Sequence, residues 1–396
     1  MRLFSENIYP DVEKRHGGNS VVFRLINEIH LEVTRRCNLR CKYCYAGIGS
    51  ENAAIMSPGM AIRIVKTVLS TTQQNEIDLI FHGGEPMLAP VAWYYEVAER
   101  VVESAKKNKK NIRFLMQSNA TLLDDTRLSM LKRYGILVST SLDGPPSLND
   151  VNRAMGERTL AGARALAGVG LLGGVIVNHN EVNDKHLQQV LDFFVANGLN
   201  IIQFVLTRRL GRWREYSSLN ADSIHRGKLI VLESLVRRPQ GPIDIGLLQI
   251  LRRFLCPPGQ RDMMRLACSQ PFCHAGIHTI IFDAHGNIYP CGLSCNIPEV
   301  QLGHIDQIDP VKYYSVLAKM HHKGSRYLNE CPNCEAARTC NFGCAIEGDI
   351  GAQECEANQR FYCSLKDLDI FQLRGALNDA DIAIRASGRR MKFIGI

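Results

Sequence analysis

Residues 28–45 of the chain read E-I-H-L-E-V-T-R-R-C-N-L-R-C-K-Y-C-Y, so a β-rich apolar run leads directly into a loop with three cysteines. The run is the first of six, and amphipathic segments of helical period separate them. Such alternation is typical of repeated βα units with parallel strands, and it predicts the α/β fold class with a partial (β/α)6 barrel. Strands are expected at 28–34, 77–82, 113–118, 137–141, 175–178 and 201–206, and the clearest helices at 59–71, 184–197 and 223–238.

The length and amino-acid composition of the chain are those of a globular protein large enough to be an enzyme. The chain has 396 residues, of which 45% are hydrophobic and 22% charged, as in ordinary globular domains. No apolar run approaches the ~20 residues that span a bilayer, and the first residues lack the apolar stretch of a secretory signal. We therefore expect a cytoplasmic protein with no membrane partner.

The 14 cysteines point to metal. Thiols in a reducing compartment seldom form structural disulfides and more often bind metal ions or clusters. Part of the net charge of +8 comes from a local excess of Lys and Arg over residues 208–267. That excess fits solvated helix faces as well as a surface for an acidic partner. Nucleic acid is not expected as a partner, because we find no helix-turn-helix, zinc finger or aromatic-interleaved basic strand.

Cys37, Cys41 and Cys44 stand in C-x3-C-x2-C spacing on the loop after the first strand. Three thiolates on a short loop can hold three irons of a 4Fe-4S cube and leave the fourth iron open for a ligand. A structural zinc loop is the alternative, but structural zinc takes four ligands and a fourth is missing nearby. In parallel barrels, catalytic groups lie at the C-terminal strand ends, where this loop begins.

This loop resembles the signature of the radical S-adenosylmethionine (radical SAM) superfamily, in which an aromatic residue, here Tyr43, precedes the last cysteine. The resemblance implies a TIM-like partial barrel whose open iron binds S-adenosylmethionine and whose reduction yields a 5′-deoxyadenosyl radical. Three further strand ends match the family's motifs: F-H-G-G-E-P at 81–86, Q-S-N-A-T at 117–121 and S-L-D-G-P at 141–145. Ser118 and Ala120 depart from the usual Q-T-N-G-T.

By that resemblance the strand ends supply the cofactor contacts. Those implied are Gly83, Gly84 and Glu85 at the methionine amino group, Ser141 at the ribose, Arg153 at the carboxylate and Asn178 at the adenosyl or ribose region, with Gln117 and Asn119 as further cofactor contacts. A guanidinium suits a carboxylate because it grips both oxygens. For each polar residue a turn or capping role is the alternative, and Asp143 is expected to form a turn.

A second cysteine pattern lies in the C-terminal part of the chain. Cys273 is followed by Gly286 and Cys291, then by C-P-N-C-E-A-A-R-T-C-N-F-G-C at 331–344, and then by Cys363. The spacing resembles the SPASM domain of radical SAM peptide maturases, which implies two auxiliary 4Fe-4S clusters beside the first. A pair of structural zinc sites is the rival interpretation.

Two cubes need eight ligands, and the motif supplies seven. The resemblance favours Cys268 as the eighth; Cys295 or an open iron is the alternative, and Cys256, Cys295 and Cys355 are otherwise expected to be buried or free thiols. The implied ligands are Cys268, Cys273, Cys291 and Cys344 for the first auxiliary cluster, and Cys331, Cys334, Cys340 and Cys363 for the second.

The chain is expected to divide into five parts. These are an N-terminal arm (1–27), the barrel (28–207), a helical bridge (208–267), the SPASM domain (268–365) and a C-terminal helix and tail (366–396). Long periodic helices are not expected from 268 to 363, a region that ligation would shape more than a large core. Residues 21–25 are a candidate edge strand for a peptide.

The family context implies a maturase that oxidises a ribosomal precursor peptide and installs a C–C cyclophane, a C–S thioether or another net oxidation. One alternative is formylglycine formation; anaerobic sulfatase maturases carry aspartate after the cysteine matching Cys291, and this chain has Gly292. Others are radical oxidation or epimerisation of a small molecule and a non-catalytic iron–sulfur protein. The implied partner for electron supply is a donor such as flavodoxin or ferredoxin. Because only 36 residues precede Cys37, the peptide's leader would bind the 208–267 bridge, the C-terminal tail or a separate peptide-recognition protein.

Overall fold

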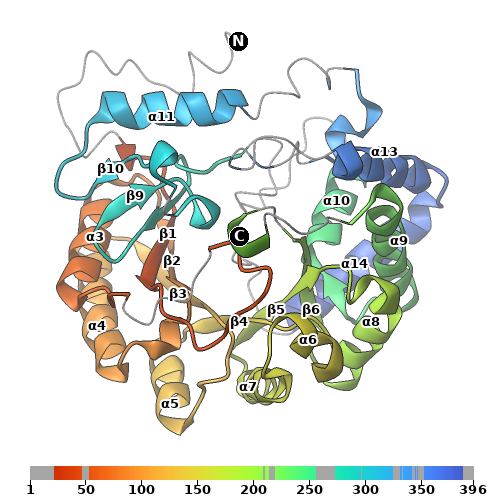
Figure 1. Ribbon diagram of the computed structural model, residues 1–396, viewed down its shortest axis with the longest axis horizontal. Coiled ribbons are helices and arrows are strands. Elements are labelled where there is room, and N and C mark those ends of the chain that lie inside the picture. The colour runs from red at the N-terminus through yellow and green to blue at the C-terminus, as the bar shows by residue number, and fades with distance from the viewer. Residues whose placement is uncertain are drawn as a thin grey trace.

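The computed structural model describes residues 22–46, 53–207, 210–213, 219–255, 273–295, 297–323, 331, 333–340, 344, 346 and 352–386. Its centre is one ten-stranded sheet in the order β10-β9-β8-β1-β2-β3-β4-β5-β6-β7. The six expected strands are all present as a parallel series that curves into an open barrel (Figure 1). Their bounds are β1 Glu28–Thr34, β2 Glu76–Gly83, β3 Asn111–Ser118, β4 Leu137–Ser141, β5 Leu172–His179 and β6 Ile201–Leu206.

Helices cover the outside of this barrel (Figure 1). They are α3 Pro58–Thr71, α4 Val91–Lys107, α5 Asp125–Tyr134, α6 Pro146–Asn152, α7 Gly156–Gly168 and α8 Leu187–Ala196. In α3, Ser57 caps the N-terminus by accepting a hydrogen bond from the Met60 amide. The helix then buries Ile64, Val65 and Val68 against the sheet. The apolar stripe predicted for this segment is therefore the face that packs on the core.

The sheet is wider than six strands. β8 (Thr279–Phe282) pairs parallel with β1, and β9 (Asn287–Tyr289) and β10 (Gly303–His304) follow it antiparallel. On the other side β7 (Ile243–Asp244) pairs with β6. Since every residue of β1 is buried, a neighbouring strand satisfies backbone groups that would otherwise lack partners. The first part of the expected SPASM domain thus adds three strands, β8 to β10, to the sheet of the barrel.

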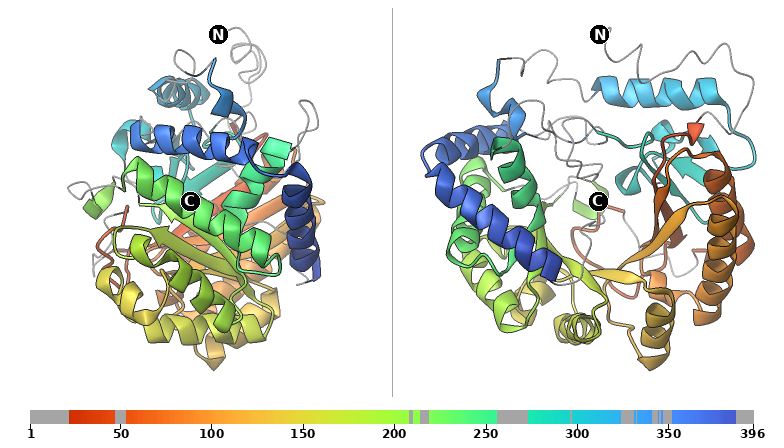
Figure 2. Two further views of the ribbon diagram at one scale, coloured as in Figure 1. Left: turned by 90° about the vertical axis from the view of Figure 1, so that its right-hand side faces the viewer. Right: turned by 180° about the vertical axis from the view of Figure 1, so that it is seen from behind.

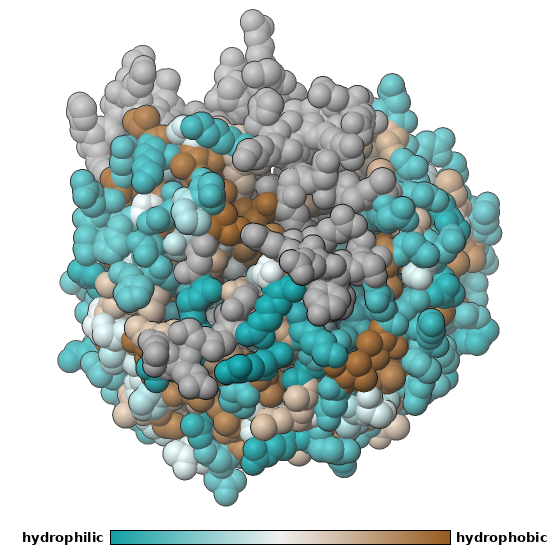
Figure 3. Space-filling model, in the orientation of Figure 1, coloured by the Kyte–Doolittle hydropathy of each residue, from teal (hydrophilic) through white to brown (hydrophobic). Residues whose placement is uncertain are grey.

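A second apolar core lies at one side of the barrel, where α9 (Ala221–Arg237), α10 (Ile245–Leu255) and α14 (Ile370–Ala386) stack together (Figure 2). The helix expected at 223–238 is α9, which begins two residues earlier because Asn220 caps it. Hydrophilic residues predominate on the face shown in Figure 3, where apolar residues appear in separate patches. Short 3-10 turns are η2 Pro86–Leu88, η3 Asp184–His186, η4 Gly211–Trp213, η6 Gly292–Ser294, η7 Pro298–Val300 and η8 Glu335–Arg338. None of the described helices is both long enough and apolar enough to cross a bilayer.

Two sequence-based expectations were wrong. Long helices do occur between 268 and 363: α11 (Pro310–Lys323) and α13 (Ala352–Lys366). Each buries a narrow stripe, such as Tyr313 and Leu317 in α11, which a search for broad amphipathic faces overlooks. The candidate edge strand at 21–25 is a helical turn over its described residues. Val22 and Phe23 are both buried there, whereas a strand would send neighbouring side chains to opposite faces.

Candidate active site

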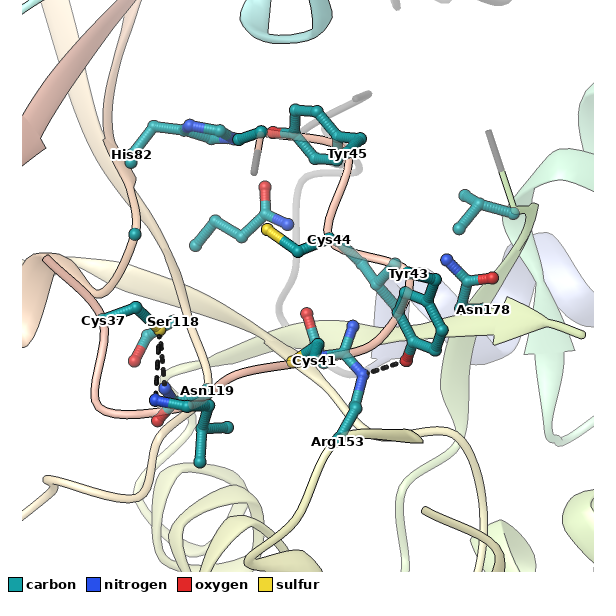
Figure 4. Close-up of a pocket in the computed structure, with 18 of the residues that line it drawn as sticks. Cys37, Cys41, Tyr43, Cys44, Tyr45, His82, Ser118, Asn119, Arg153 and Asn178 are labelled. Atoms are coloured by element: carbon teal, nitrogen blue, oxygen red, sulfur yellow. Dashed lines mark hydrogen bonds between the residues drawn. The ribbon is translucent and has the colours of Figure 1, made fainter. Parts of the chain in front are cut away.

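The cysteine loop after β1 forms one wall of a pocket at the C-terminal ends of the barrel strands (Figure 4). Cys37, Cys41 and Cys44 all line it. Burial raises the pKa of Cys37 to about 12 and also raises that of Cys41, and metal binding would hold both as thiolates. The expected cofactor residues that also line this pocket are Gly83, Gly84, Gln117, Asn119, Ser141, Arg153 and Asn178.

Glu85 stands apart from the expected contact with a cofactor ammonium, because its side chain does not line the pocket and has no exposed surface. One carboxylate oxygen accepts hydrogen bonds from the Ser118 hydroxyl at 2.8 Å and the Met87 amide at 2.9 Å. The other accepts from the Asn119 amide at 2.8 Å. Glu85 therefore fixes the end of β3 beneath the pocket. Burial raises its pKa and the three donors oppose that rise.

Gly83 packs closely against the end of β1, and Asn119 lies near Cys37. Gly83 has φ = 128°, and a Cβ there would lie 2.3 Å from the Thr34 carbonyl oxygen, so only glycine fits. Asn119 donates to the Asn38 side chain at 2.9 Å, and its Nδ2 lies 4.0 Å from Cys37 Sγ. These contacts tie the cysteine loop to the end of β3.

A second network holds the other end of the loop. Arg153 lies over the Tyr43 ring, 5.2 Å from its centroid, donates to the Tyr43 hydroxyl and lies 3.4 Å from Asp143. Tyr43 in turn donates to Asp143, which also accepts from the Asn178 amide at 2.9 Å. Arg153 Nη1 lies 4.0 Å from Cys41 Sγ. The buried Asp143 therefore links Tyr43 of the cysteine loop, Arg153 at the end of α6 and Asn178 at the end of β5, a larger role than the expected turn, and orients Arg153 toward the pocket.

His82 and Tyr45 form a pair that sequence reasoning missed. The Tyr45 hydroxyl lies 3.3 Å from His82 Nε2, and both residues line the pocket (Figure 4). Burial, with a smaller contribution from His30, lowers the pKa of His82 to about 3, so the imidazole is neutral at neutral pH. The available signal was position: His82 directly precedes G-G-E-P, and Tyr45 directly follows Cys44.

The loop after β9 faces this pair. A Cβ at Gly292 would lie 3.6 Å from His82 Nε2 and 3.7 Å from the Tyr45 hydroxyl. Leu293, the next residue, lines the pocket. The cysteine beside them, Cys291, therefore lies close to the strand-end pocket, so a cluster bound there would be near a substrate.

Cys291 also lies near two other expected ligands of the first auxiliary cluster. Burial, then the nearby thiols of Cys344 and Cys273, raise the pKa of Cys291 to about 12. Cys268 lies outside the described residues. Cys295, the alternative eighth ligand, is buried beside Ile281 and Tyr289.

The expected ligands of the second auxiliary cluster surround η8. Cys334 caps that turn, its amide donates to the Cys331 carbonyl at 3.1 Å, and the Cys340 amide donates to Ala336 at 2.9 Å. Cys363 is exposed on α13, which contacts η8. The fourth expected ligand therefore comes from an element that packs against the other three.

Within the ranges the structure describes, no three Cys, His, Asp or Glu side chains converge as they would around one metal ion. The three thiols of the first loop line one pocket, and a 4Fe-4S cube binds its thiolates at separate corners. The pocket with Cys37, Cys41 and Cys44 therefore fits a cube with one vacant iron.

Comparison with known proteins gives a matching family model, curated relatives and solved structures of similar fold. Residues 31–194 match the family model of the Radical SAM superfamily. The chain is 23% identical over 353 residues to the serine-type anaerobic sulfatase-maturating enzyme of Klebsiella aerogenes, covering 83% of this chain and 82% of that one. The solved structure of native anSMEcpe with AdoMet and the Cp18Cys peptide aligns with a TM-score of 0.71 at 18% identity, covering 89% and 99% of the two chains. Streptococcus suis SuiB bound to its precursor peptide SuiA aligns with a TM-score of 0.53 at 14% identity, covering 74% and 68%.

Proposed function

We propose that this chain, whose residues 31–194 match the Radical SAM superfamily model, is a radical SAM enzyme that matures a ribosomal precursor peptide by removing a hydrogen atom and installing a crosslink. One observation carries the proposal: three thiols of one loop and seven expected cofactor residues line a single pocket. Leu293, two residues after Cys291, lines that pocket, so an electron released by the substrate radical would have a short way to an auxiliary cluster.

We assign the cofactor contacts to the chain as follows. Cys37, Cys41 and Cys44 hold the first cluster, and the backbone at Gly83 and Gly84 approaches S-adenosylmethionine closely. When both are bound, they supply the 5′-deoxyadenosyl radical. The remaining contacts are Gln117 and Asn119 near the amino group, Ser141 at the ribose, Arg153 at the carboxylate and Asn178 at the adenosyl or ribose region. The protein's share is to position the substrate carbon and to keep water from the radical.

The two auxiliary clusters would take up the electron that a net oxidation releases. We assign Cys268, Cys273, Cys291 and Cys344 to the first and Cys331, Cys334, Cys340 and Cys363 to the second. The mutual proximity of Cys273, Cys291 and Cys344 supports the first assignment. The turn at η8 supports the second.

A peptide substrate is supported by what two relatives bind, since anSMEcpe and SuiB are both solved with peptides. A crosslink is favoured over formylglycine because Gly292 provides no carboxylate at the His82 and Tyr45 end of the pocket. His82 is neutral there, so this end suits an uncharged substrate side chain. A cytoplasmic location, a flavodoxin or ferredoxin as electron donor and a separate peptide-recognition protein complete the proposal.

The test is an anaerobic turnover assay with the reconstituted protein and the peptide encoded by a short open reading frame beside its gene. We expect 5′-deoxyadenosine and a peptide that has lost two hydrogen atoms. Fragmentation should be blocked between the crosslinked residues, and an aldehyde-trapping hydrazide should not react. Cys44→Ala should abolish 5′-deoxyadenosine, whereas Cys355→Ala should not. Reaction of the product with the hydrazide would instead support formylglycine, and activity in Cys44→Ala would contradict the assignment.

A further inference from the structure

The second cysteine group is contacted by amide side chains of α13. Asn358 Nδ2 lies 3.7 Å from Cys340 Sγ, and Gln359 Nε2 lies 3.7 Å from Cys334 Sγ. Both are N–H donors to sulfur atoms that would bind iron. Gln359 also lies 3.9 Å from Cys355 Sγ. Hydrogen bonds to cluster sulfurs are among the factors that set a cluster's reduction potential.

A lysine forms a hydrogen bond with one of these two amides. Lys228 Nζ, from α9, donates to Asn358 Oδ1, so the ammonium and Cys340 Sγ lie at opposite ends of one amide. Because the lysine draws electron density from the carbonyl, the amide N–H becomes a stronger donor to the sulfur. Lys228 Nζ also lies 5.7 Å from the centroid of the Phe361 ring, so the ammonium has an apolar neighbour as well.

Other charged residues lie near Lys228 and Cys340. Arg253, from α10, is near enough to Cys340 for the thiolate to favour its charged form, although burial lowers the pKa of Arg253 to about 10. It is therefore a cation at neutral pH. Burial also lowers the pKa of Lys228, while Glu354, Cys340 and Asp244 oppose that change. The cations thus come from α9 and α10 and the acidic groups from α13 and β7.

The first auxiliary group differs. The described groups that act on Cys291 are the thiols of Cys344 and Cys273 and the hydroxyl and backbone of Ser294, and none of these is cationic. Among the described residues, no amide joins Cys291 to a cation in the way that Asn358 joins Cys340 to Lys228. Since the reduced cluster carries one more negative charge, a nearby cation stabilises it and raises its potential.

We propose that Lys228, acting through Asn358, raises the reduction potential of the cluster bound by the Cys331–Cys340 turn above that of the cluster bound at Cys291. This inference rests on the cluster placement proposed above. An electron taken from the substrate would then reduce the oxidised cluster at Cys291 and pass on, one electron and no proton, to the oxidised cluster near Lys228. A one-electron carrier protein would remove it from there. Lys228 is a positioning residue in this scheme and need not touch substrate.

The test measures potentials and does not depend on turnover. In a background that carries Cys37→Ala, Cys41→Ala and Cys44→Ala, anaerobic reconstitution should leave the two auxiliary clusters, about eight irons per chain. Redox titration followed by electron paramagnetic resonance should then give two midpoints. Lys228→Met should shift the higher midpoint to a more negative value and leave the lower one in place.

Three further variants control this result. Lys228→Arg keeps the charge and should restore the midpoint. Asn358→Leu removes the amide between Lys228 and Cys340 and should shift the same midpoint in the same direction. Adding Lys228→Met to Asn358→Leu should increase that shift only a little. Arg237→Gln removes an exposed charge that pairs with Glu233 on the same helix and should shift neither midpoint.

Several outcomes would overturn the inference. These are unchanged midpoints in both Lys228→Met and Asn358→Leu at full iron content, equal shifts of both clusters, or a shift of the lower midpoint alone. If the Lys228→Met protein binds less iron, the midpoint shift of Asn358→Leu is the result that tests the inference. A background protein that binds only about four irons would contradict the cluster placement itself, and this result is distinguishable from unmoved midpoints at about eight irons.

Discussion

Replacing Glu85 with glutamine tests whether this carboxylate holds the floor of the pocket. Its oxygens accept from Ser118 at 2.8 Å, Met87 at 2.9 Å and Asn119 at 2.8 Å, and the side chain is fully buried. Glutamine keeps one oxygen and presents an NH2 group to the third donor. If the oxygen stays with Ser118 and Met87, the Asn119 amide faces another donor and loses its partner.

The magnitude follows from two opposing contributions. An unsatisfied buried amide costs about 1–3 kcal/mol, and hydrogen bonds to a charged acceptor are each worth about 1.5–3 kcal/mol against about 1 for neutral ones. Removing a buried charge recovers part of its desolvation cost, which is why burial raises the pKa of Glu85. We therefore expect Glu85→Gln to lower the free energy of unfolding by about 2 kcal/mol.

The assay is urea unfolding of the metal-free protein under anaerobic conditions, followed by tryptophan fluorescence, because Trp93 is buried in the barrel core. Glu76→Gln is the matched control: Glu76 is exposed at the start of β2, the strand that precedes Glu85, and accepts from Asn111 at 2.6 Å. It should change stability by less than about 0.5 kcal/mol. Equal effects of the two substitutions would refute the role assigned to Glu85.

Three other substitutions probe the fold and the pocket. Burial raises the pKa of Asp244 from 3.8 to about 6, so between these values the folded protein keeps a proton that the unfolded chain releases; its contribution to stability should fall by roughly 2 kcal/mol from pH 4 to pH 6, and urea unfolding of Asp244→Asn should lack this decline. Gly162→Ala would place a Cβ 2.4 Å from the Ala120 carbonyl oxygen, and thermal unfolding should show a loss of about 1–3 kcal/mol that Gly168→Ala, with open space around it, does not share. Arg153→Lys replaces the planar guanidinium, which can bind both carboxylate oxygens, with a single ammonium. Equilibrium binding of S-adenosylmethionine to the reconstituted protein should therefore weaken at least about tenfold, and unchanged affinity would contradict the proposal that Arg153 binds the carboxylate of S-adenosylmethionine.

The sequence was most informative where the hydrophobic periodicity of a segment and the place of a motif at the end of a strand could be read together. The six barrel strands were predicted within a few residues, because alternating runs and helical stripes repeat along 28–206. The pocket residues followed from strand ends, since parallel strands bring their C-terminal ends to one place. Asn119, Arg153 and Asn178 are far apart in sequence, and topology alone brings them to one pocket.

Features that depend on tertiary contact were not predictable. β8 has four residues and β7 has two, too few for a periodic signal, and each exists because a barrel edge needs a partner. α13 buries few side chains, among them Phe361 and Leu365. The hydrogen bonds of Glu85 to Ser118, Met87 and Asn119 were not predictable either, because the sequence shows its motif and not its surroundings.

The central claim is that the cluster held by Cys37, Cys41 and Cys44 keeps one iron open for S-adenosylmethionine. Electron paramagnetic resonance of the reduced, reconstituted protein, which should bind about twelve irons per chain, tests it most directly. Adding S-adenosylmethionine should change the spectrum of one cluster, and the change should disappear in Cys44→Ala while the two auxiliary signals persist. A spectrum that S-adenosylmethionine leaves unchanged, with all three clusters present, would contradict the claim.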